Sequence, residues 1–258
     1  MPSLARVTAP VIGVPVDAVS LDEMLARIGE WAARRESRVV CLCNVHSVVT
    51  AASDPMHRTA LGGADLALAD GAPVAWALRR LGFRNQARIT GSDVMEGCCR
   101  QAERDQSPVF LYGSTPETLA RLRSRLEATM PRLQIAGDRA PPFRDLTREE
   151  DEAVVRRVND SGATVVFVGL GCPKQEAWMA AHRGRIRAVM IGVGAAFDFR
   201  AGTVKRAPAW AQSAGLEWLH RLVSEPRRVW KRYLVTNTVF ILRFCAQLAR
   251  HWLLHGAR

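Results

Sequence analysis

The amino-acid sequence predicts an α/β fold with a doubly wound, mostly parallel sheet (Rossmann-like), followed by a basic α-helical appendage at the C-terminal end. Short apolar runs alternate with amphipathic, helix-length segments, as expected for strands that lie between two layers of helices. Glycine or small polar residues follow nearly every apolar run, where parallel sheets place their ligand-binding turns. The composition shifts at about Ala201-Gly202, where a basic segment rich in tryptophan begins.

Six short, predominantly apolar runs are expected to form the strands. They are Arg38–Cys43, Asp65–Ala69, Pro108–Tyr112, Leu133–Ala136, Thr164–Val168 and Ala188–Gly192. Apolar periodicity, N-capping residues and prolines in first turns predict the helices between them. These helices are Asp22–Arg35, a segment ending near Ala52, Val74–Leu81, a segment ending near Arg104, Glu117–Thr129, a segment from a Thr147–Glu150 capping box to Asn159, and a segment after Pro173.

The stretch Thr164–Glu176 (TVVFVGLGCPKQE) combines a strand, a glycine turn and the start of a helix. Gly169 and Gly171 allow the backbone to turn tightly and to approach a ligand closely. Lys174 and Gln175 fall in the first helical turn. Such a turn favours anion binding at the carboxyl edge of a sheet, although an ordinary strand–helix turn has the same features.

Polar residues and glycines also follow the other strands. They are Asn44, Asp70, Gly113 and the segment Gly194–Asp198, which ends in the carboxylate of Asp198. Because the carboxyl ends of parallel strands lie at one edge of the sheet, these turns are expected to converge on a binding cleft.

Several classes of protein and site lack support in the sequence. The N-terminal residues do not resemble a secretory signal and no apolar run has the length of a membrane span, so we expect a cytoplasmic location. None of the six cysteines has C-x-x-C spacing, which argues against a zinc site or a disulfide framework. The P-loop motif and the D-x-D element that holds a metal ion in many sugar-nucleotide transferases are absent. We therefore expect no cofactor and no metal, so that a bound diphosphate would be neutralised by arginine, lysine and helix N-termini.

Asp70 is the candidate general base, because it ends a strand and has no basic neighbour in sequence. A half-buried carboxylate in that position can have its pKa raised towards a useful value. N-capping of the helix that begins at Pro73 is the alternative role. Arg88 is expected either to pair with a phosphate or sugar carboxylate or to lie on the surface.

Three other polar residues near the predicted edge have less distinctive settings. Asp93 heads a helix and is expected to cap it. Asp198, between two phenylalanines, would contact a ligand or hold the turn in place. His46 follows Asn44 at the edge of the cleft, and a single histidine there has little diagnostic value.

Residues 203–258 hold ten basic and two acidic residues, and so contribute +8 of the net charge of +11. Within Tyr233–Leu254, a helix would gather arginines on one side and aliphatic and aromatic residues on the other, which suits an anionic membrane surface. Packing on the domain or on another subunit is the alternative. Nucleic-acid binding would also explain the charge, but no nucleic-acid motif accompanies it. We divide the chain into an α/β domain, residues 1–202, and a basic helical membrane-association appendage, residues 203–258.

These motifs, taken together and in order, resemble the WecG/TagA/CpsF family of bacterial glycosyltransferases (glycosyltransferase family 26). The similarity covers about Ile12 to Tyr233. The matching segments are Asn44–Ser47, Ala69–Gly71, Arg88–Asp93, Val109–Gly113, Gly169–Glu176, Gly192–Phe199, Arg206–Trp210, Gly215–Leu222 and Glu225–Arg228.

The resemblance implies a metal-independent, inverting transferase that uses a UDP-sugar. Its acceptor would be a sugar on undecaprenyl diphosphate at the cytoplasmic face of the membrane, in the synthesis of cell-surface polysaccharide or exopolysaccharide. Its donor sugar would be N-acetylmannosamine, glucose or a related hexose. A homo-oligomer is compatible with this assignment.

The resemblance also assigns roles to individual residues. It places the base on Asp70, the arginine of the R-x-T-G motif on Arg88 and the glutamine of the P-K-Q-E motif on Gln175. The tail arginines expected to close over the active site are Arg206, Arg221, Arg227 and Arg228. The competing hypothesis is a non-catalytic basic protein that binds a nucleotide or nucleic acid.

Overall fold

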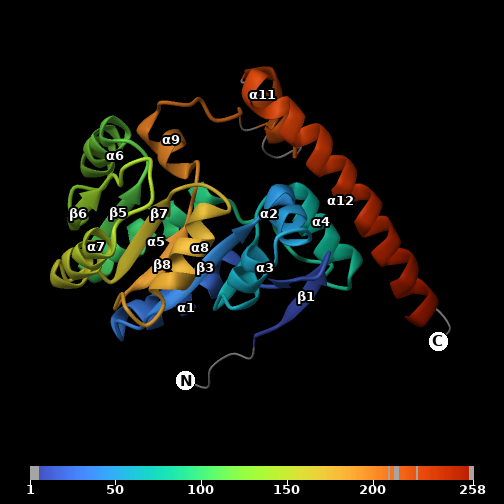
Figure 1. The fold of residues 1–258 in the computed structure, drawn as a ribbon, viewed down its shortest axis with the longest axis horizontal. Helices are drawn as coiled ribbons and strands as arrows, with labels where there is room; N and C mark the ends of the chain where they lie inside the picture. Colours follow the sequence, from blue (N-terminus) through green and yellow to red (C-terminus); the bar gives the residue numbers. More distant parts are fainter. Residues whose placement is uncertain (1–5, 209, 212–214, 225, 256–258) are drawn as a thin grey trace.

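The structure, a computed structural model, describes residues 6–208, 210–211, 215–224 and 226–255. Eight strands form one sheet in the order β1-β2-β4-β3-β8-β7-β5-β6, parallel throughout except for the β1–β2 pair (Figure 1). The strands are β1 (Thr8–Val11), β2 (Val14–Asp17), β3 (Arg38–Cys43), β4 (Leu66–Ala69), β5 (Val109–Gly113), β6 (Ile135–Arg139), β7 (Val165–Gly169) and β8 (Val189–Gly192). All six predicted strands are present, and the doubly wound α/β fold is confirmed.

The β1–β2 hairpin was not predicted. Its two-residue turn consists of Ile12 and Gly13, which have φ values of 51° and 85°. Two successive residues with positive φ match the twist of an antiparallel pair. The sequence signal was a glycine between two short valine-rich runs, but Pro10 and Pro15 obscured it because proline is uncommon within strands.

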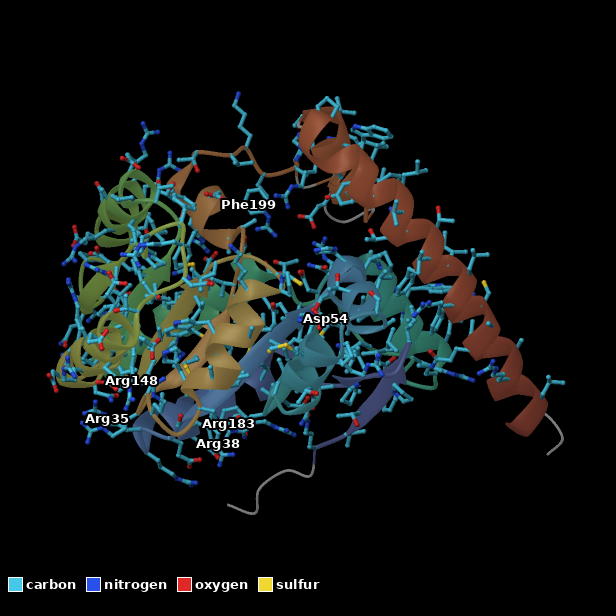
Figure 2. All side chains as sticks on the ribbon, in the orientation of Figure 1. Arg35, Arg38, Asp54, Arg148, Arg183 and Phe199 are labelled. Carbon is cyan, nitrogen blue, oxygen red and sulfur yellow. The ribbon has the colours of Figure 1, made fainter. Side chains whose placement is uncertain are left out.

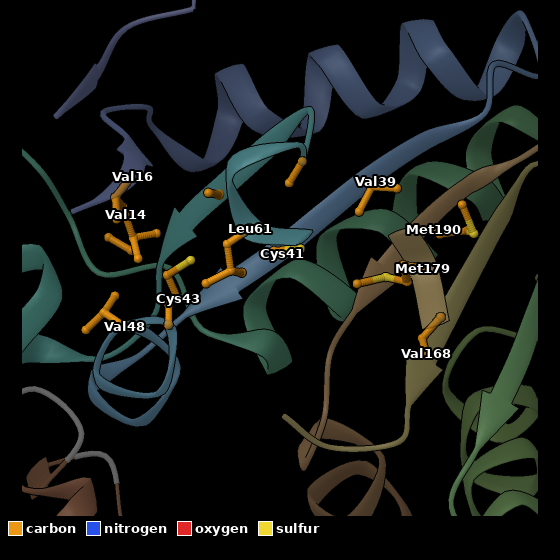
Figure 3. Close-up of a cluster of buried hydrophobic side chains, with 14 of the residues drawn as sticks. Val14, Val16, Val39, Cys41, Cys43, Val48, Leu61, Val168, Met179 and Met190 are labelled. Carbon is orange, nitrogen blue, oxygen red and sulfur yellow. The ribbon is translucent and has the colours of Figure 1, made fainter. Parts of the chain in front are cut away.

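Helices cover both faces of the sheet, and each face has its own apolar core. One layer contains α1 (Leu21–Ala33), α5 (Gly91–Asp105), α6 (Pro116–Thr129) and α9 (Ala196–Ala201). The other layer contains α2 (Val45–Ala51), α3 (Pro55–Gly62), α4 (Ala72–Arg80), α7 (Arg148–Asp160) and α8 (Lys174–His182). Cys41 and Cys43 of β3 are fully buried beside Leu61 of α3, so they are small core residues as expected (Figure 3).

The direction of the chain connections reverses between β5 and β7, which makes this position the topological switch point of the sheet. The chain leaves β5 into α6 on one face, and leaves β7 into α8 on the opposite face. Ligands of doubly wound sheets bind outside the carboxyl ends of the strands at such a switch point.

Ion pairs connect the segments at the amino ends of the strands. Asp65, just before β4, pairs with Arg38 of β3 at 2.8 Å and with Arg183 after α8 at 2.7 Å (Figure 2).

The C-terminal appendage contains α11 (Glu217–Ser224) and the long helix α12 (Pro226–His255). Figure 1 shows the segment after α9 crossing to α11, with α12 running down the side of the domain past α2 and α4. Phe240 and Phe244 of α12 are buried in the core on this face. The ring of Phe244 meets Trp76 of α4 edge-on, with centroids 5.5 Å apart.

A polar contact also fastens α12 to the β1–β2 hairpin. The side chain of Gln247 accepts a hydrogen bond from Ile12 N at 2.8 Å and donates one to Pro10 O at 2.5 Å. Leu234, Val235 and Leu242 of α12 are exposed, and Ile241 is exposed where it lines the cleft described below. Among the helices that the structure describes, none is both long enough and apolar enough to cross a membrane.

Candidate active site

A cleft of about 1880 Å³ lies between the carboxyl edge of the sheet and the C-terminal appendage. Pockets for small ligands usually enclose about 300–1,000 Å³, so this cleft has room for two substrates. Ten predicted site residues line it: Asn44, Asp70, Arg88, Gly169, Gly171, Lys174, Gln175, Asp198, Arg206 and Arg221. Gly113 is not among the lining residues, and Arg227 and Arg228 lie outside the described side chains.

Asp70 stands directly after β4 with its side chain half-buried. The N-cap of α4 is Gly71, and no side chain makes a capping hydrogen bond there, so Asp70 does not cap that helix. Instead, its Oδ2 accepts a hydrogen bond from Asn44 Nδ2 at 3.3 Å. Asn44 is itself held as the N-cap of α2, because its Oδ1 accepts from Ser47 N at 3.1 Å. The helix cap therefore orients the amide that contacts Asp70.

Burial raises the pKa of Asp70 to about 6. The hydrogen bond from Asn44 and the charge of Arg88 act in the opposite direction, whereas the charges of Glu217 and Asp93 raise the pKa further. A general base is most effective when its pKa lies near the working pH. This carboxylate therefore has the protonation behaviour of a base that works at neutral pH.

Two predicted arginines meet at Glu217 of α11. Arg88 Nη1 donates to Glu217 Oε2, and Arg206 Nε lies 3.5 Å from Glu217 Oε1. Sequence reasoning did not select Glu217, although it belongs to the matched Gly215–Leu222 segment, because nothing local indicates its distant partners. The pairing brings two guanidinium groups to one wall of the cleft.

The start of α5 supports the second arginine. Thr90 is the N-cap of α5 and Asp93 completes a capping box, so the capping role expected for Asp93 is confirmed. Arg206 Nη2 donates to Thr90 Oγ1 at 3.3 Å and lies 3.5 Å from Asp93 Oδ1. Thr90 of the R-x-T-G motif thus holds Arg206 of the appendage by a hydrogen bond.

A third arginine of the appendage contacts α9. The guanidinium carbon of Arg221 lies 5.8 Å from the centre of the Phe199 ring, which is a cation–π distance. Phe199 lies on α9, beneath the link to α11 (Figure 2). The carbonyl oxygen of its neighbour Asp198 accepts from Thr203 N and from Thr203 Oγ1, both at 3.1 Å, while Asp198 also lines the cleft. Both roles expected for Asp198 remain compatible with this geometry.

The glycines at the switch point bring β5 and β7 close together. Gly113 and Gly169 are paired across the two strands, and a Cβ on Gly113 would lie 2.6 Å from the carbonyl carbon of Gly169. A Cβ on Gly169 would lie 2.6 Å from the Phe197 ring. Packing between backbones and a buried ring therefore accounts for both glycines.

Gln175 is buried at the start of α8 and faces the cleft. Its Nε2 donates to Glu176 Oε1 at 2.8 Å, and its Oε1 has no hydrogen-bond partner among the described residues. Lys174 is exposed at the same helix start. Gln175 thus offers an acceptor to the cleft, while Lys174 offers a positive charge at its edge.

The model of the glycosyl transferase WecG/TagA/CpsF family matches residues 9–253. The chain belongs to this family. Membership confirms the resemblance drawn from the motifs and makes the chain a glycosyltransferase of cell-surface polymer synthesis. The match extends over α11 and nearly all of α12, so the appendage is part of the family's sequence pattern.

Proposed function

We propose that this glycosyltransferase moves a sugar from UDP to an acceptor hydroxyl by a single inverting displacement. The observation that carries the proposal is that Asp70, with a pKa of about 6, faces the same cleft as the paired arginines Arg88 and Arg206. Asp70 takes the proton of the acceptor hydroxyl. The hydroxyl oxygen then forms a bond to the anomeric carbon as the bond from that carbon to UDP breaks on the opposite face.

The leaving diphosphate gains negative charge in this step, and cationic groups that await it lower the barrier. Arg88 and Arg206 are suited to this role, because guanidinium groups bind phosphate oxygens in a bidentate manner. The donor diphosphate would compete with Glu217 for the same two groups. With arginines supplying the charge, the proposed chemistry needs no metal ion and no cofactor.

The appendage provides the proposed contact with the membrane. The outward side of α12 exposes Leu234, Val235 and Leu242, which are 59–66% accessible, beside the cations of a strongly basic segment. An apolar strip with flanking basic residues binds at the interface of an anionic bilayer. Since residues of α11 and α12 also line the cleft, docking on the cytoplasmic face would bring the cleft to a lipid-linked acceptor.

The finer assignment of substrates rests on the resemblance to the family. The donor would be a UDP-sugar carrying N-acetylmannosamine, glucose or a related hexose, and the acceptor a sugar on undecaprenyl diphosphate. The product would enter cell-surface polysaccharide or exopolysaccharide synthesis. The geometry favours this reading over a non-catalytic nucleotide-binding protein, because a half-buried carboxylate with a raised pKa that faces a cleft has no evident use in such a protein.

A panel of UDP-sugars tested with a polyprenyl-diphosphate-linked acceptor, without added divalent cations, decides the proposal. We expect UDP release that requires the acceptor, together with a product of inverted anomeric configuration. UDP binding without turnover for every donor would favour the binding protein. A strict requirement for Mg²⁺ or Mn²⁺ would contradict the role assigned to the arginines.

A further inference from the structure

Three potential metal ligands from separate parts of the chain meet beside the cleft. They are His57 of α3, Cys172 in the turn after β7, and Glu176 of α8. One ligand atom from each lies within 4.8 Å of the other two. His57 Nε2 and Cys172 Sγ are 3.6 Å apart.

The carboxylate of this cluster is buried with little compensation for its charge. Glu176 is fully buried; its Oε1 accepts a hydrogen bond from Gln175 and the Cys172 thiol also interacts with the carboxylate, but its Oε2 has no partner at full hydrogen-bond geometry among the described residues. Among the described residues, no arginine, lysine or histidine forms an ion pair with Glu176. Burying a carboxylate is costly unless a cation or several hydrogen bonds compensate. His57 is 2% exposed, and its Nδ1 has no partner among the described residues either.

We propose that His57, Cys172 and Glu176 bind one divalent transition-metal ion of the Zn²⁺ type, a site that the cysteine spacing did not predict because its ligands come from distant segments. Imidazole nitrogen, thiolate sulfur and carboxylate oxygen are the three ligand types that zinc uses in proteins. In a tetrahedral zinc site the ligand atoms lie roughly 3.5 Å apart, given bonds of about 2.0–2.3 Å. The His57–Cys172 separation of 3.6 Å meets that requirement, and a carboxylate oxygen of Glu176 lies within 4.8 Å of both other ligand atoms.

The surroundings provide access and a fourth position. Cys172 lines the cleft and is half-buried, so an ion can arrive from the solvent side. A water molecule from the cleft would complete the tetrahedron. Ser47 Oγ, 3.3 Å from His57 Nε2, lies next to the cluster. Binding converts the Cys172 thiol to a thiolate and releases its proton to the solvent.

The ion would have a structural role that is separate from the transfer reaction. It would tie α3 to the first turn of α8, where Glu176 receives the hydrogen bond from Gln175. Because Gln175 faces the cleft, the ion would hold that amide in place. Asp70 and the Arg88–Glu217–Arg206 group are not among its ligands, so the proposal stands or falls independently of the proposed reaction.

Cobalt binding to the purified full-length protein provides the test. After treatment with a chelator and dialysis, the protein is titrated with Co²⁺, and the near-ultraviolet and visible spectra are recorded. We expect one equivalent to bind with a thiolate-to-cobalt charge-transfer band and the visible bands of a tetrahedral ion, and we expect Zn²⁺ to displace it. Failure of the wild-type protein to bind one equivalent with these bands would overturn the proposal.

Substitutions of the proposed ligands test whether these residues bind the Co²⁺ ion. Cys172→Ser should abolish the charge-transfer band, and Glu176→Gln should weaken Co²⁺ binding by about tenfold or more. The matched control is Cys245→Ser, which removes an exposed thiol of α12 and should leave the spectrum unchanged. A band that persists in Cys172→Ser, or that disappears in Cys245→Ser, would overturn the assignment. If Cys172→Ser does not fold, Glu176→Gln and the wild-type titration still decide the question.

Discussion

Glu217 of the appendage forms an ion pair with Arg88, which lies 129 residues earlier in the chain. The two side chains are 21% and 29% exposed, so the pair is more shielded from solvent than an ordinary surface salt bridge. Arg206 lies against the other oxygen of the same carboxylate. This contact joins the R-x-T-G motif of the domain to the appendage, and it sets the charge balance around Asp70.

Replacing the proposed base should nearly abolish turnover. We expect Asp70→Asn to lower kcat by about 10²–10⁴-fold, because the amide retains the shape of the carboxylate but cannot accept the acceptor's proton. The measurement is initial-rate UDP release at saturating donor and acceptor. Asp105→Asn, at an exposed position at the end of α5, is the control and should retain wild-type turnover. Near wild-type activity in Asp70→Asn would remove Asp70 from the mechanism.

The pH dependence should report the raised pKa of Asp70. The base acts in its deprotonated form, so kcat/KM should rise with pH through about 6. This rise forms the acidic limb of the pH profile. Because the charge of Glu217 raises the pKa of Asp70, Glu217→Gln should move the acidic limb to lower pH. Since Arg88 lowers it, Arg88→Gln should move the limb to higher pH.

Full profiles of kcat/KM against pH for these variants check the two opposite shifts. Glu30→Gln, at an exposed position on α1, provides a control with the same change of charge and should leave the limb in place. An acidic limb that stays fixed in both site variants would mean that another group controls it.

The two paired arginines should act mainly in the transition state. We expect Arg88→Ala and Arg206→Ala each to lower kcat by about 10²–10³-fold, as is found when one preorganised donor to a developing charge is removed. Lysine at either position should restore part of the activity, because it keeps the charge without the bidentate geometry. Arg84→Ala, in an exposed loop, is the control. A rise in KM with kcat unchanged would show that these groups bind the ground state equally well.

The inward face of α12 should contribute strongly to stability. We expect Phe244→Ala to lower the free energy of unfolding by about 3–5 kcal/mol, because it leaves a cavity between α12 and α4. Leu242→Ala, two residues away on the exposed face, should change it by less than about 0.5 kcal/mol. Urea denaturation followed by circular dichroism measures both. Equal effects of the two substitutions would contradict the observed orientation of α12.

The outward face of α12 should govern membrane binding. We expect Leu242→Glu combined with Val235→Glu to lower binding to anionic phospholipid vesicles by at least about tenfold, because it places negative charge in the interfacial strip. Co-sedimentation at several lipid concentrations measures the effect. Met56→Glu alters an exposed apolar side chain on α3 and should not change binding. Unchanged binding of the α12 variant would place the membrane contact elsewhere.

The sequence by itself determined the six parallel strands β3 to β8, most helix starts and the edge at which the cleft opens, but not the β1–β2 hairpin. Apolar runs such as Thr164–Val168 and the Thr147–Glu150 capping box depend on residues a few positions apart, so a local pattern is sufficient to predict them. Asp70 could be selected for the same reason, because the end of a buried strand already defines its surroundings. The division of the chain at about residue 202 stays a prediction.

The tertiary structure alone decided which residues meet in the cleft. The Asn44–Asp70 hydrogen bond and the Arg88–Glu217 ion pair join segments that are 26 and 129 residues apart. Nothing in the local spacing of either segment encodes such a partner, because the contact arises only when the strands are ordered in the sheet and α11 is placed over it. The close approach of Gly113 to Gly169 has the same origin, since strand pairing rather than sequence spacing brings their backbones together.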